Sequence, residues 1–468
     1  MNTLGYLLTD EQMQAYIVNG YLSVQIDLPT AFHTAIYKQA ETIFGQGPNP
    51  WNDIYPLIPE LVEVFAHPAV VGALTSILGR GYIMHPHRHC HLNRPGTPAQ
   101  GQHKDSYEED ENVRHHRTRW AMAFYYPQDV TVEMGPSAIQ PGTQYYNTRQ
   151  EAQQHQEIAL TGKAGTVTII HYDLWHRALA NQSDQQRFMM KFLFCRMEEP
   201  AEPSWNSQGS DWVGPANGSA SPVQGHDELW QRLWQWHMGW DACQETQHGS
   251  GTPNGDKDIL TEEADALLGQ SEAQRLNAAY RLACLGEAAV PTLMDALVTE
   301  STSSLTANLK ASHTNPSELY SAHGLAAVGQ PTIPALIEVM ESQDWWLRAA
   351  AANILGNMGL TANPAIRALT SALQDESEWV RRNAVESLGI LGARAKSAVL
   401  ELARVLADED ELSWVRHNAA LALARMGAEA APARPILESV LTHEDLYISG
   451  NAKIALERMT NASTASTL

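Results

Sequence analysis

The stretch "GTVTIIHYDLWHRALANQSDQQRFMMKF", residues 165–192, combines two β-type runs with a polar segment between them. Both runs are rich in β-branched and aromatic residues, and turn-forming Asn, Ser and Asp separate them. If the polar segment turns a hairpin, His176 and Arg187 lie on adjacent antiparallel strands at nearly facing positions. The stretch therefore predicts a histidine beside an arginine within an all-β fold.

Short runs of the same kind begin near residue 81 and continue to about residue 197. Such runs, separated by Gly, Pro, Asn and Asp, are typical of a β-sandwich or barrel. The chain before them is expected to be helical. Thr9 is a suitable N-cap and Gly20 a suitable end for a short helix, and further helical stretches are expected around residues 30–44 and 57–78.

The stretch "GQHKDSY", residues 101–107, places His103 and Asp105 two positions apart, on the same side of an extended chain. Together with His176 they provide two imidazoles and one carboxylate. This set can bind a metal ion and leave other coordination positions open, as in non-haem Fe(II) oxygenases. His171 is a competing third ligand, but it lies five residues from His176 and would face the opposite way in a strand.

Arg187 follows His176 by eleven residues, and its guanidinium group is suited to a cosubstrate that carries a carboxylate. A guanidinium group can hold a carboxylate through two parallel hydrogen bonds. 2-Oxoglutarate needs such a partner, because its keto acid end chelates the metal while its far carboxylate requires a fixed cation. Arg187 is therefore predicted to anchor 2-oxoglutarate.

The stretch "MHPHRHCHLN", residues 84–93, carries a histidine at every second position. In an extended strand these imidazoles and Asn93 share one face. Residues two apart are separated by roughly 6.5–7 Å along a strand, so the column cannot converge on one ion. This histidine column consists of His85, His87, His89 and His91. It forms either a wall of the metal site or a solvent-exposed face of the sheet.

Four segments, taken in order, resemble the phytanoyl-CoA dioxygenase family of Fe(II)/2-oxoglutarate oxygenases. The resemblance covers roughly residues 5–200. The segments are "LTDEQMQAYIVNGYLSV" (8–24), "RPGTPAQGQHKD" (94–105), "DVTVEMGPSAIQPGTQYY" (129–146) and the stretch at 165–187.

The resemblance implies a double-stranded β-helix, or jelly roll, with iron held by His103, Asp105 and His176 and with 2-oxoglutarate anchored by Arg187. It also implies that O₂ is consumed while 2-oxoglutarate is oxidised to succinate and CO₂. Related halogenases have a small residue in place of the carboxylate, so an aspartate favours hydroxylation or desaturation. If the histidine face points inward, Asn93 and some of the imidazoles contact 2-oxoglutarate or substrate.

Two positions depart from the family pattern. Ala178 stands where many members carry a small hydroxyl residue that touches the cosubstrate, and the usual Pro-Gly-Ser-His turn reads "PGTQ" at residues 141–144. The densely charged segment at 106–119 carries Glu108–Glu111, which is either a solvated loop or an attraction for a cationic substrate.

The last 200 residues contain an internal repeat of 33 to 35 residues. In most copies an arginine precedes a glycine by eleven residues, and a second helix, such as the one that begins near Pro364, follows. This period predicts an α-solenoid. The repeats resemble HEAT repeats over roughly 257–460. In one unit Glu318 stands in place of the arginine. The clearest copies are "WWLRAAAANILGNMG" (345–359), "EWVRRNAVESLGILG" (378–392) and "SWVRHNAALALARMG" (413–427).

The domain prediction is an oxygenase domain at 1–200, a tryptophan-bearing linker or flap at 201–256, a HEAT-like solenoid at 257–460 and a tail at 461–468. Six tryptophans between 205 and 240 are unusual for a solvated linker, so part of this segment is expected to pack on a domain.

Composition narrows the class of partners. Lys and Arg total 31 against 53 for Asp and Glu, a formal charge of −22 that disfavours nucleic acids and anionic membrane surfaces. The four cysteines form no CxxC pair, and no secretion signal or run of eighteen apolar residues is found, which favours reduced thiols in a cytoplasmic protein.

The sequence therefore predicts an Fe(II)/2-oxoglutarate-dependent dioxygenase joined to a solenoid that docks a protein partner or a substrate. The substrate is a small molecule or is bound to a carrier or protein. The alternative is a non-catalytic scaffold with a degenerate oxygenase fold.

Overall fold

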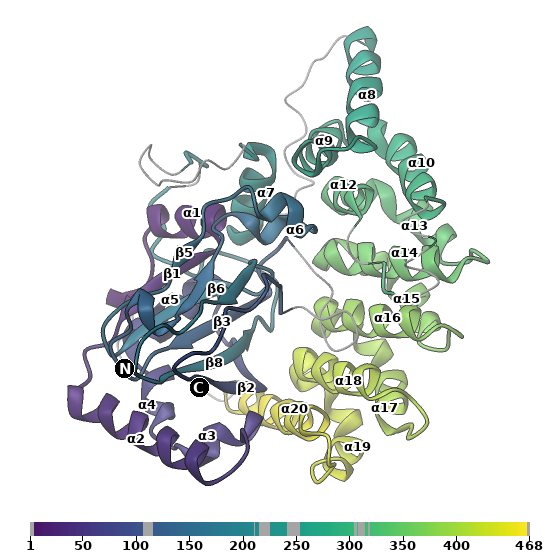
Figure 1. Cartoon of the computed structure of the whole chain (residues 1–468). Coiled ribbons are helices and arrows are strands. Elements are labelled where there is room, and N and C mark those ends of the chain that lie inside the picture. The colour runs from purple at the N-terminus through teal and green to yellow at the C-terminus, as the bar shows by residue number, and fades with distance from the viewer. Residues whose placement is uncertain are drawn as a thin grey trace. The chain divides into compact units, whose positions relative to one another are not determined.

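The computed structural model describes residues 4–105, 116–209, 211–214, 225–240, 253–303, 307, 314–316 and 319–465. It divides the chain into two compact units. The β unit comprises residues 1–105 and 118–225, and the solenoid unit comprises residues 106–117 and 226–468. Figure 1 shows the elements of both. Glu108–Glu111, Cys243 and Glu318, which the sequence singles out, lie outside the described residues.

The β unit is built on two antiparallel sheets, which confirms the predicted jelly-roll class of fold. The larger sheet has the order β1-β6-β3-β8-β2 and the smaller one the order β5-β4-β7. The strands are β1 (Tyr21–Gln25), β2 (Ile83–Asn93), β3 (Trp120–Tyr125), β4 (Ser137–Ile139), β5 (Ile158–Ala159), β6 (Thr166–His171), β7 (His176–Ala178) and β8 (Arg187–Cys195).

The predicted hairpin between His176 and Arg187 is wrong. Strand β7 pairs with β4 in the smaller sheet, whereas β8 pairs with β3 and β2 in the larger one. The segment between them crosses from one sheet to the other. Local bonds close a turn within it, such as the Ser183 N–H to Asn181 Oδ1 at 3.0 Å, and the Asn181 side chain also donates to the carbonyl oxygen of the distant Asn93 at 3.0 Å.

The helices of the β unit largely follow the prediction. The first α-helix is capped by Thr9 and ends at Gly20, as expected. The predicted helix at 57–78 is divided, because Pro68 has no N–H to continue a helix and instead begins a new one. The elements are η1 (Leu4–Tyr6), α1 (Asp10–Asn19), α2 (Thr30–Gln46), η2 (Trp51–Asp53), α3 (Ile54–Leu57), α4 (Leu61–Phe65), α5 (Pro68–Leu78), η3 (Val132–Met134), η4 (Thr143–Tyr145) and α6 (Arg149–Ala152).

Helices cover the outer face of the larger sheet. Phe188 and Phe192 project from β8 to this face, where Phe188 meets Tyr37 of α2 at a ring distance of 5.3 Å and Phe192 meets Phe65 of α4 at 4.3 Å. Because successive side chains alternate in a strand, Arg187, Met189 and Lys191 point to the opposite, inner face. The strand therefore buries aromatic residues on one side and presents two cations on the other.

The solenoid unit consists of stacked helix pairs, which confirms the predicted HEAT-like architecture (Figure 1). Its α-helices are α7 (Asp227–His237), α8 (Pro253–Leu267), α9 (Glu272–Cys284), α10 (Val290–Ser301), α12 (Tyr320–Val328), α13 (Ile333–Val339), α14 (Trp345–Asn357), α15 (Ile366–Ala372), α16 (Glu378–Leu391), α17 (Val399–Ala407), α18 (Ser413–Met426), α19 (Arg434–Ser439) and α20 (Leu446–Ala465). The 3₁₀ helices are η5 (Gly286–Ala289), η6 (Gln330–Thr332), η7 (Gly359–Ala365), η8 (Gly392–Ala398) and η9 (Gly427–Ala433).

The repeated glycine has a conformational role. It follows the first helix of a repeat and adopts a positive φ, which is 63° at Gly359, 56° at Gly392 and 58° at Gly427. Residues with a β-carbon are strained in this left-handed region. The glycine therefore turns the chain from the first helix of each repeat into the second.

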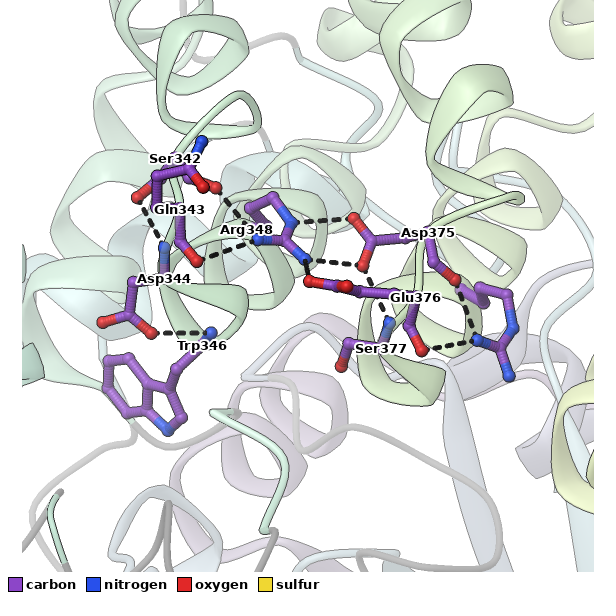
Figure 2. Close-up of polar contacts among 9 residues, drawn as sticks. Ser342, Gln343, Asp344, Trp346, Arg348, Asp375, Glu376 and Ser377 are labelled. Carbon is purple, nitrogen blue, oxygen red and sulfur yellow. Dashed lines mark hydrogen bonds and ion pairs between the residues drawn. The ribbon is translucent and has the colours of Figure 1, made fainter.

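The repeated arginine joins one repeat to the next. Arg348 makes a bidentate pair with Asp375, with nitrogen–oxygen distances of 2.7 and 2.8 Å, and donates to the Ser342 carbonyl at 2.9 Å (Figure 2). Arg381 repeats the arrangement with Glu411, at 2.5 and 2.8 Å, and with the Asp375 carbonyl at 2.8 Å. Each guanidinium thus connects the loop before its own helix to the loop of the following repeat.

The tryptophans of the 201–256 segment are divided between the two units. Trp205 lies in the β unit, where its indole N–H donates to the Asp10 carboxylate at 2.6 Å. Trp230, Trp234 and Trp236 lie on α7 in the solenoid unit and are buried. Their burial explains why so many tryptophans occur in a segment whose composition otherwise resembles a linker.

Two further predictions concern the environment of the chain. Cys90, Cys195 and Cys284 are free thiols in the part of the chain that the structure describes. Among the described helices, none has both the length and the apolar character needed to cross a membrane.

Candidate metal centre

His103 and His176 are brought together by a single bridge between two chain segments. The backbone N–H of His103 donates to the carbonyl of His176 at 2.9 Å, and the N–H of His176 donates to the carbonyl of His103 at 3.0 Å. Facing residues of an antiparallel pair place their side chains on the same side. The bridge therefore directs both imidazoles toward one point, from positions far apart in the sequence.

Asp105 completes the cluster. His103 Nε2 lies 3.7 Å from Asp105 Oδ1, and His176 Nε2 lies 3.4 Å from Asp105 Oδ2. The ligand atoms of all three residues lie within 4.8 Å of one another. The structure thus brings together the three residues that the sequence selected, and they could hold one metal ion.

Hydrogen bonds fix which ring nitrogen faces the cluster. His103 Nδ1 lies 2.9 Å from the Gly101 carbonyl, and His176 Nδ1 lies 2.9 Å from the Leu174 carbonyl. Because a carbonyl oxygen only accepts, each Nδ1 carries the hydrogen and each Nε2 presents a lone pair. Carbonyl partners of this kind orient metal-binding histidines.

The charge state of the cluster suits a cation. Burial raises the pKa of the Asp105 carboxyl, but the nearby Lys191 ammonium and the His176 ring outweigh it and hold that pKa well below its usual range. Burial, together with the neighbouring His176, lowers the pKa of His103. A charged carboxylate beside a neutral His103 is the state in which both residues can bind metal.

Lys191 is a component of the site that the sequence analysis missed. Its Nζ donates to Asp105 Oδ2 at 2.8 Å, and the two side chains are only 8% and 4% exposed. The signal was present in the sequence, because Lys191 lies four residues after Arg187 in a strand and therefore faces the same way. It occupies one oxygen of the carboxylate and leaves the other to face His103.

Arg187 lies on the same face of β8, with 1% of its surface exposed. Its Nε and Nη2 donate to the Gly135 carbonyl at 3.2 and 2.5 Å, and the guanidinium carbon lies 6.0 Å from the centre of the Tyr126 ring. Its Nη1 is buried and has no hydrogen-bond partner among the described residues. A fixed, buried guanidinium with an unused donor is suited to bind a carboxylate.

Asn93 faces Arg187 across the β2–β8 pair. Its side-chain amide donates to the carbonyls of Gly135 and Leu179 at 2.8 and 3.1 Å, while its Oδ1 is buried without a partner among the described residues. Gly135 has a φ of 65°, and a β-carbon there would lie 2.5 Å from Asn93 Nδ2. Asn93 and Arg187 thus hold the same tight turn.

Two members of the histidine column, His89 and His91, face inward. His89 pairs with Lys191 and His91 with Met189 across β2 and β8, on the face that also carries Arg187. Burial, and after it the Lys191 charge, lowers the pKa of His91 well below its usual value, and its Nε2 is buried without a partner among the described residues. Of the two interpretations that the sequence left open, a wall of the site agrees with this placement.

The competing ligand His171 is not part of the cluster. It ends β6, and its Nδ1 accepts the backbone N–H of Asp173 at 3.1 Å. Gln144 belongs to the altered "PGTQ" turn. Its side chain donates to the Ile17 carbonyl near the end of α1 at 3.0 Å, so it connects the turn to that helix. Ala178 lies at the end of β7, where its N–H donates to the Gln100 side chain at 3.1 Å.

Comparison with known proteins identifies both parts of the chain. Residues 47–189 match the model of the phytanoyl-CoA dioxygenase (PhyH) family, and residues 304–389, 333–412 and 366–457 match HEAT repeats. The chain therefore carries a domain of the phytanoyl-CoA dioxygenase family followed by HEAT repeats, as the sequence predicted. Together with the cluster of His103, Asp105 and His176, the family match supports an oxygenase of the iron- and 2-oxoglutarate-dependent type.

Several solved structures are similar to the chain. The non-haem α-ketoglutarate-dependent carbocyclase SnoK from nogalamycin biosynthesis is 19% identical, with 41% of this chain and 85% of that chain covered and a TM-score of 0.35. The epimerase SnoN in complex with Fe³⁺, α-ketoglutarate and nogalamycin RO is 16% identical, with 40% and 83% covered and a TM-score of 0.36. EctD from S. alaskensis with 2-oxoglutarate and 5-hydroxyectoine is 15% identical, with 43% and 82% covered and a TM-score of 0.36. A search of the curated proteins finds no significant match.

Proposed function

We propose that the β unit is an Fe(II)/2-oxoglutarate-dependent dioxygenase that consumes O₂ and hydroxylates or desaturates an organic substrate. The observation that carries the proposal is the cluster of His103, Asp105 and His176, whose ligand atoms lie within 4.8 Å of one another. When bound, Fe(II) supplies the redox chemistry that couples oxidation of 2-oxoglutarate to succinate and CO₂ with oxidation of the substrate.

The protein's own contribution is to hold the ligands in place before the metal arrives. His103 and His176 would bind it through Nε2, because their Nδ1 atoms are engaged by backbone carbonyls. Asp105 would bind it through the oxygen that Lys191 leaves available. Lys191 is in this proposal a positioning residue, which fixes the orientation of the carboxylate.

Arg187 would hold the far carboxylate of 2-oxoglutarate. The Gly135 carbonyl fixes two of its nitrogens, and the third is buried without a described partner, so the guanidinium needs little reorganisation to bind an anion. Asn93 supports the same turn through the Gly135 carbonyl, and its Oδ1 is the group through which it would contact a bound molecule.

The HEAT repeats are proposed to dock a protein partner or a substrate bound to a protein or carrier, since stacked repeats present extended binding surfaces. The three free thiols agree with a reducing, cytoplasmic location.

One observation favours a second function, that of a scaffold that binds no metal. The Lys191 ammonium already neutralises the Asp105 carboxylate at 2.8 Å. A positive charge at this distance would repel a metal cation and lower its affinity. In this alternative the oxygenase fold serves for binding only.

The test is anaerobic addition of Fe(II) and 2-oxoglutarate to the full-length protein, followed through the visible charge-transfer band of the chelate. O₂ is then admitted and succinate is measured. We expect the band and succinate in the wild type, no band in Asp105→Ala, and a band only at much higher 2-oxoglutarate concentration in Arg187→Ala.

Matched controls replace exposed residues of the same unit, Asp184→Ala and Arg80→Ala, and should behave as the wild type. If the wild type binds no Fe(II) and forms no succinate, the scaffold function replaces the oxygenase.

A further inference from the structure

A cavity lies within the solenoid unit, at the edge formed by α7, α9 and α12. All of its lining residues belong to this unit, including two that precede β3 in the chain. The residues that characterise it are His116, Arg117, Arg232, Trp236, Tyr280 and His323.

Flat rings form much of the cavity wall. The His116 ring stacks on the His323 ring, with centroids 3.7 Å apart and planes inclined by 22°, and its Nδ1 lies 2.7 Å from the Tyr280 hydroxyl. The Trp236 ring, 7% exposed, lies 5.7 Å from the Arg117 guanidinium carbon. These rings are held in place by packing and by a hydrogen bond, so they offer a preformed surface for another flat group.

The same cavity carries positive charge. Arg232 projects from α7, and its Nη1 donates to the Ala327 carbonyl at 2.9 Å while its Nη2 lies 3.7 Å from Cys284 Sγ. Neither contact neutralises the guanidinium. The described residues that line the cavity include Arg117 and Arg232 but no Asp or Glu, although the whole chain has a formal charge of −22.

We propose that this cavity is a binding site for a small organic anion that carries a flat ring. Its phosphate or carboxylate is held by Arg232, since a guanidinium group binds both anions through paired hydrogen bonds. Its ring lies against Trp236 and the stacked pair of His116 and His323. The site shares no residue with the candidate metal centre, and the proposal does not depend on the oxygenase function.

The test is isothermal titration calorimetry of the full-length protein with three probes, without added metal or 2-oxoglutarate and at constant ionic strength. Adenosine monophosphate combines a phosphate with a flat ring, benzoate combines a carboxylate with one, and inorganic phosphate has no ring. We expect saturable binding of one molecule of adenosine monophosphate or benzoate per chain, with inorganic phosphate binding more weakly. The stronger of the two ring-bearing probes distinguishes a phosphate ligand from a carboxylate ligand.

Single substitutions test whether the probes bind in this cavity. Arg232→Gln should weaken the better probe roughly tenfold or more, because a charge-assisted contact is lost. Arg232→Lys, which keeps the charge, should weaken it less. Arg367→Gln, which replaces an exposed arginine on α15, should leave the affinity unchanged.

Thermal melting of each variant shows that the unit remains folded. The proposal is overturned if neither ring-bearing probe binds the wild type, if neither binds more tightly than inorganic phosphate, or if folded Arg232→Gln and Arg367→Gln bind the better probe equally well.

Discussion

The two units assemble their polar clusters in opposite ways. In the solenoid unit, Arg348 reaches Asp375 only 27 residues away, and Arg381 reaches Glu411 only 30 residues away. In the β unit, Lys191 reaches Asp105 across 86 residues. The solenoid clusters depend on one repeat and its neighbour, whereas the candidate metal centre depends on the pairing of distant segments.

This difference predicts how each unit responds to substitution. A change in the metal centre should abolish one function and leave the fold intact, because sheet pairing holds the backbone independently of the side chains. A change in a repeat should lower stability in proportion to the contact that is lost. The following experiments test this contrast, beginning with the largest expected effect.

His176→Ala should lower Fe(II) affinity by more than ~100-fold. Removing a residue that only hydrogen-bonds to a metal ligand typically lowers affinity by ~10- to 100-fold, and removing a ligand itself should lower it further. The reason is that one of three donor atoms is removed from the cluster. Anaerobic equilibrium dialysis measures the affinity, and circular dichroism should show an unchanged fold. His171→Ala is the matched control, since it removes a buried histidine five residues away and should retain Fe(II). Equal losses in the two variants would show that the metal binds elsewhere.

Arg187→Lys should weaken 2-oxoglutarate binding by about 1.5–3 kcal/mol, the contribution of a charged hydrogen bond, which is on the order of 10- to 100-fold. Lysine keeps the charge but cannot reproduce the planar fork held by the Gly135 carbonyl. Titration of the charge-transfer band gives the affinity, while Fe(II) binding should be unchanged. Arg177→Lys, which alters a partly exposed pair with Glu157, serves as control. An unaltered 2-oxoglutarate affinity in Arg187→Lys would remove this residue from the cosubstrate site.

Arg381→Ala should destabilise the solenoid unit by about 2 kcal/mol, less than the loss of a fully buried ion pair because this arginine is partly exposed. The substitution leaves Glu411, only 7% exposed, without its bidentate partner. Urea denaturation followed by circular dichroism gives the difference. Arg434→Ala, whose contact with Glu438 is 3.6 Å long and exposed, should cost less than ~0.5 kcal/mol. Similar costs for both would mean that the repeated arginine does not join the repeats.

Gly427→Ala should cost about 1 kcal/mol or more, the strain of a β-carbon at φ 58° and ψ −127°, a combination that only glycine adopts readily. Its φ is 58° and no atom lies within 4 Å of the position that a β-carbon would take, so conformational strain is isolated from steric overlap. Gly45→Ala, in helix α2 with no atom within 4 Å and no positive φ, is the matched control and should not destabilise the protein. Denaturation midpoints measure both, and an alanine variant as stable as the wild type would contradict the role assigned to the repeated glycine.

The sequence predicted the solenoid in detail because its determinants recur at short range. The spacing of Arg348 and Gly359 reappears at Arg381 and Gly392, and each copy supports the same interpretation. Helix bounds followed from the same pattern, since each repeated glycine lies just after the helix that it ends. Local sequence patterns are sufficient to predict a structure whose stabilising contacts are also local.

The β unit was predicted less completely. The strands and the cluster of His103, Asp105 and His176 were found, because alternation and spacing identify residues on one face. The hairpin was wrong, because β7 and β8 pair in different sheets, and the local turn at residues 181–185 does not reveal which strand β8 pairs with. No local pattern distinguishes such a crossing from a turn.

Lys191 was missed, and the direction of the histidine column was left open, for a related reason. Which face of a strand lies inward depends on what packs against the other face, and here Phe188 and Phe192 contact aromatic residues of helices α2 and α4. Once that outer face is identified, the strand period places Lys191 beside Arg187 and His89 opposite Lys191.

The division of the chain also limits how its parts can be separated. The backbone passes between the two units at residues 105–106, 117–118 and 225–226, so the solenoid unit is not a single C-terminal block. A truncation that removes residues 257–468 would leave His116 without Tyr280 and His323 and would deprive α7 of α9. The tryptophan-rich helix would then be exposed, and the shortened chain would be prone to aggregate whatever its chemistry. A gene fusion or exchange that transferred the whole solenoid unit would have to move two separate stretches, 106–117 and 226–468, together, which favours inheritance of the two units as one piece.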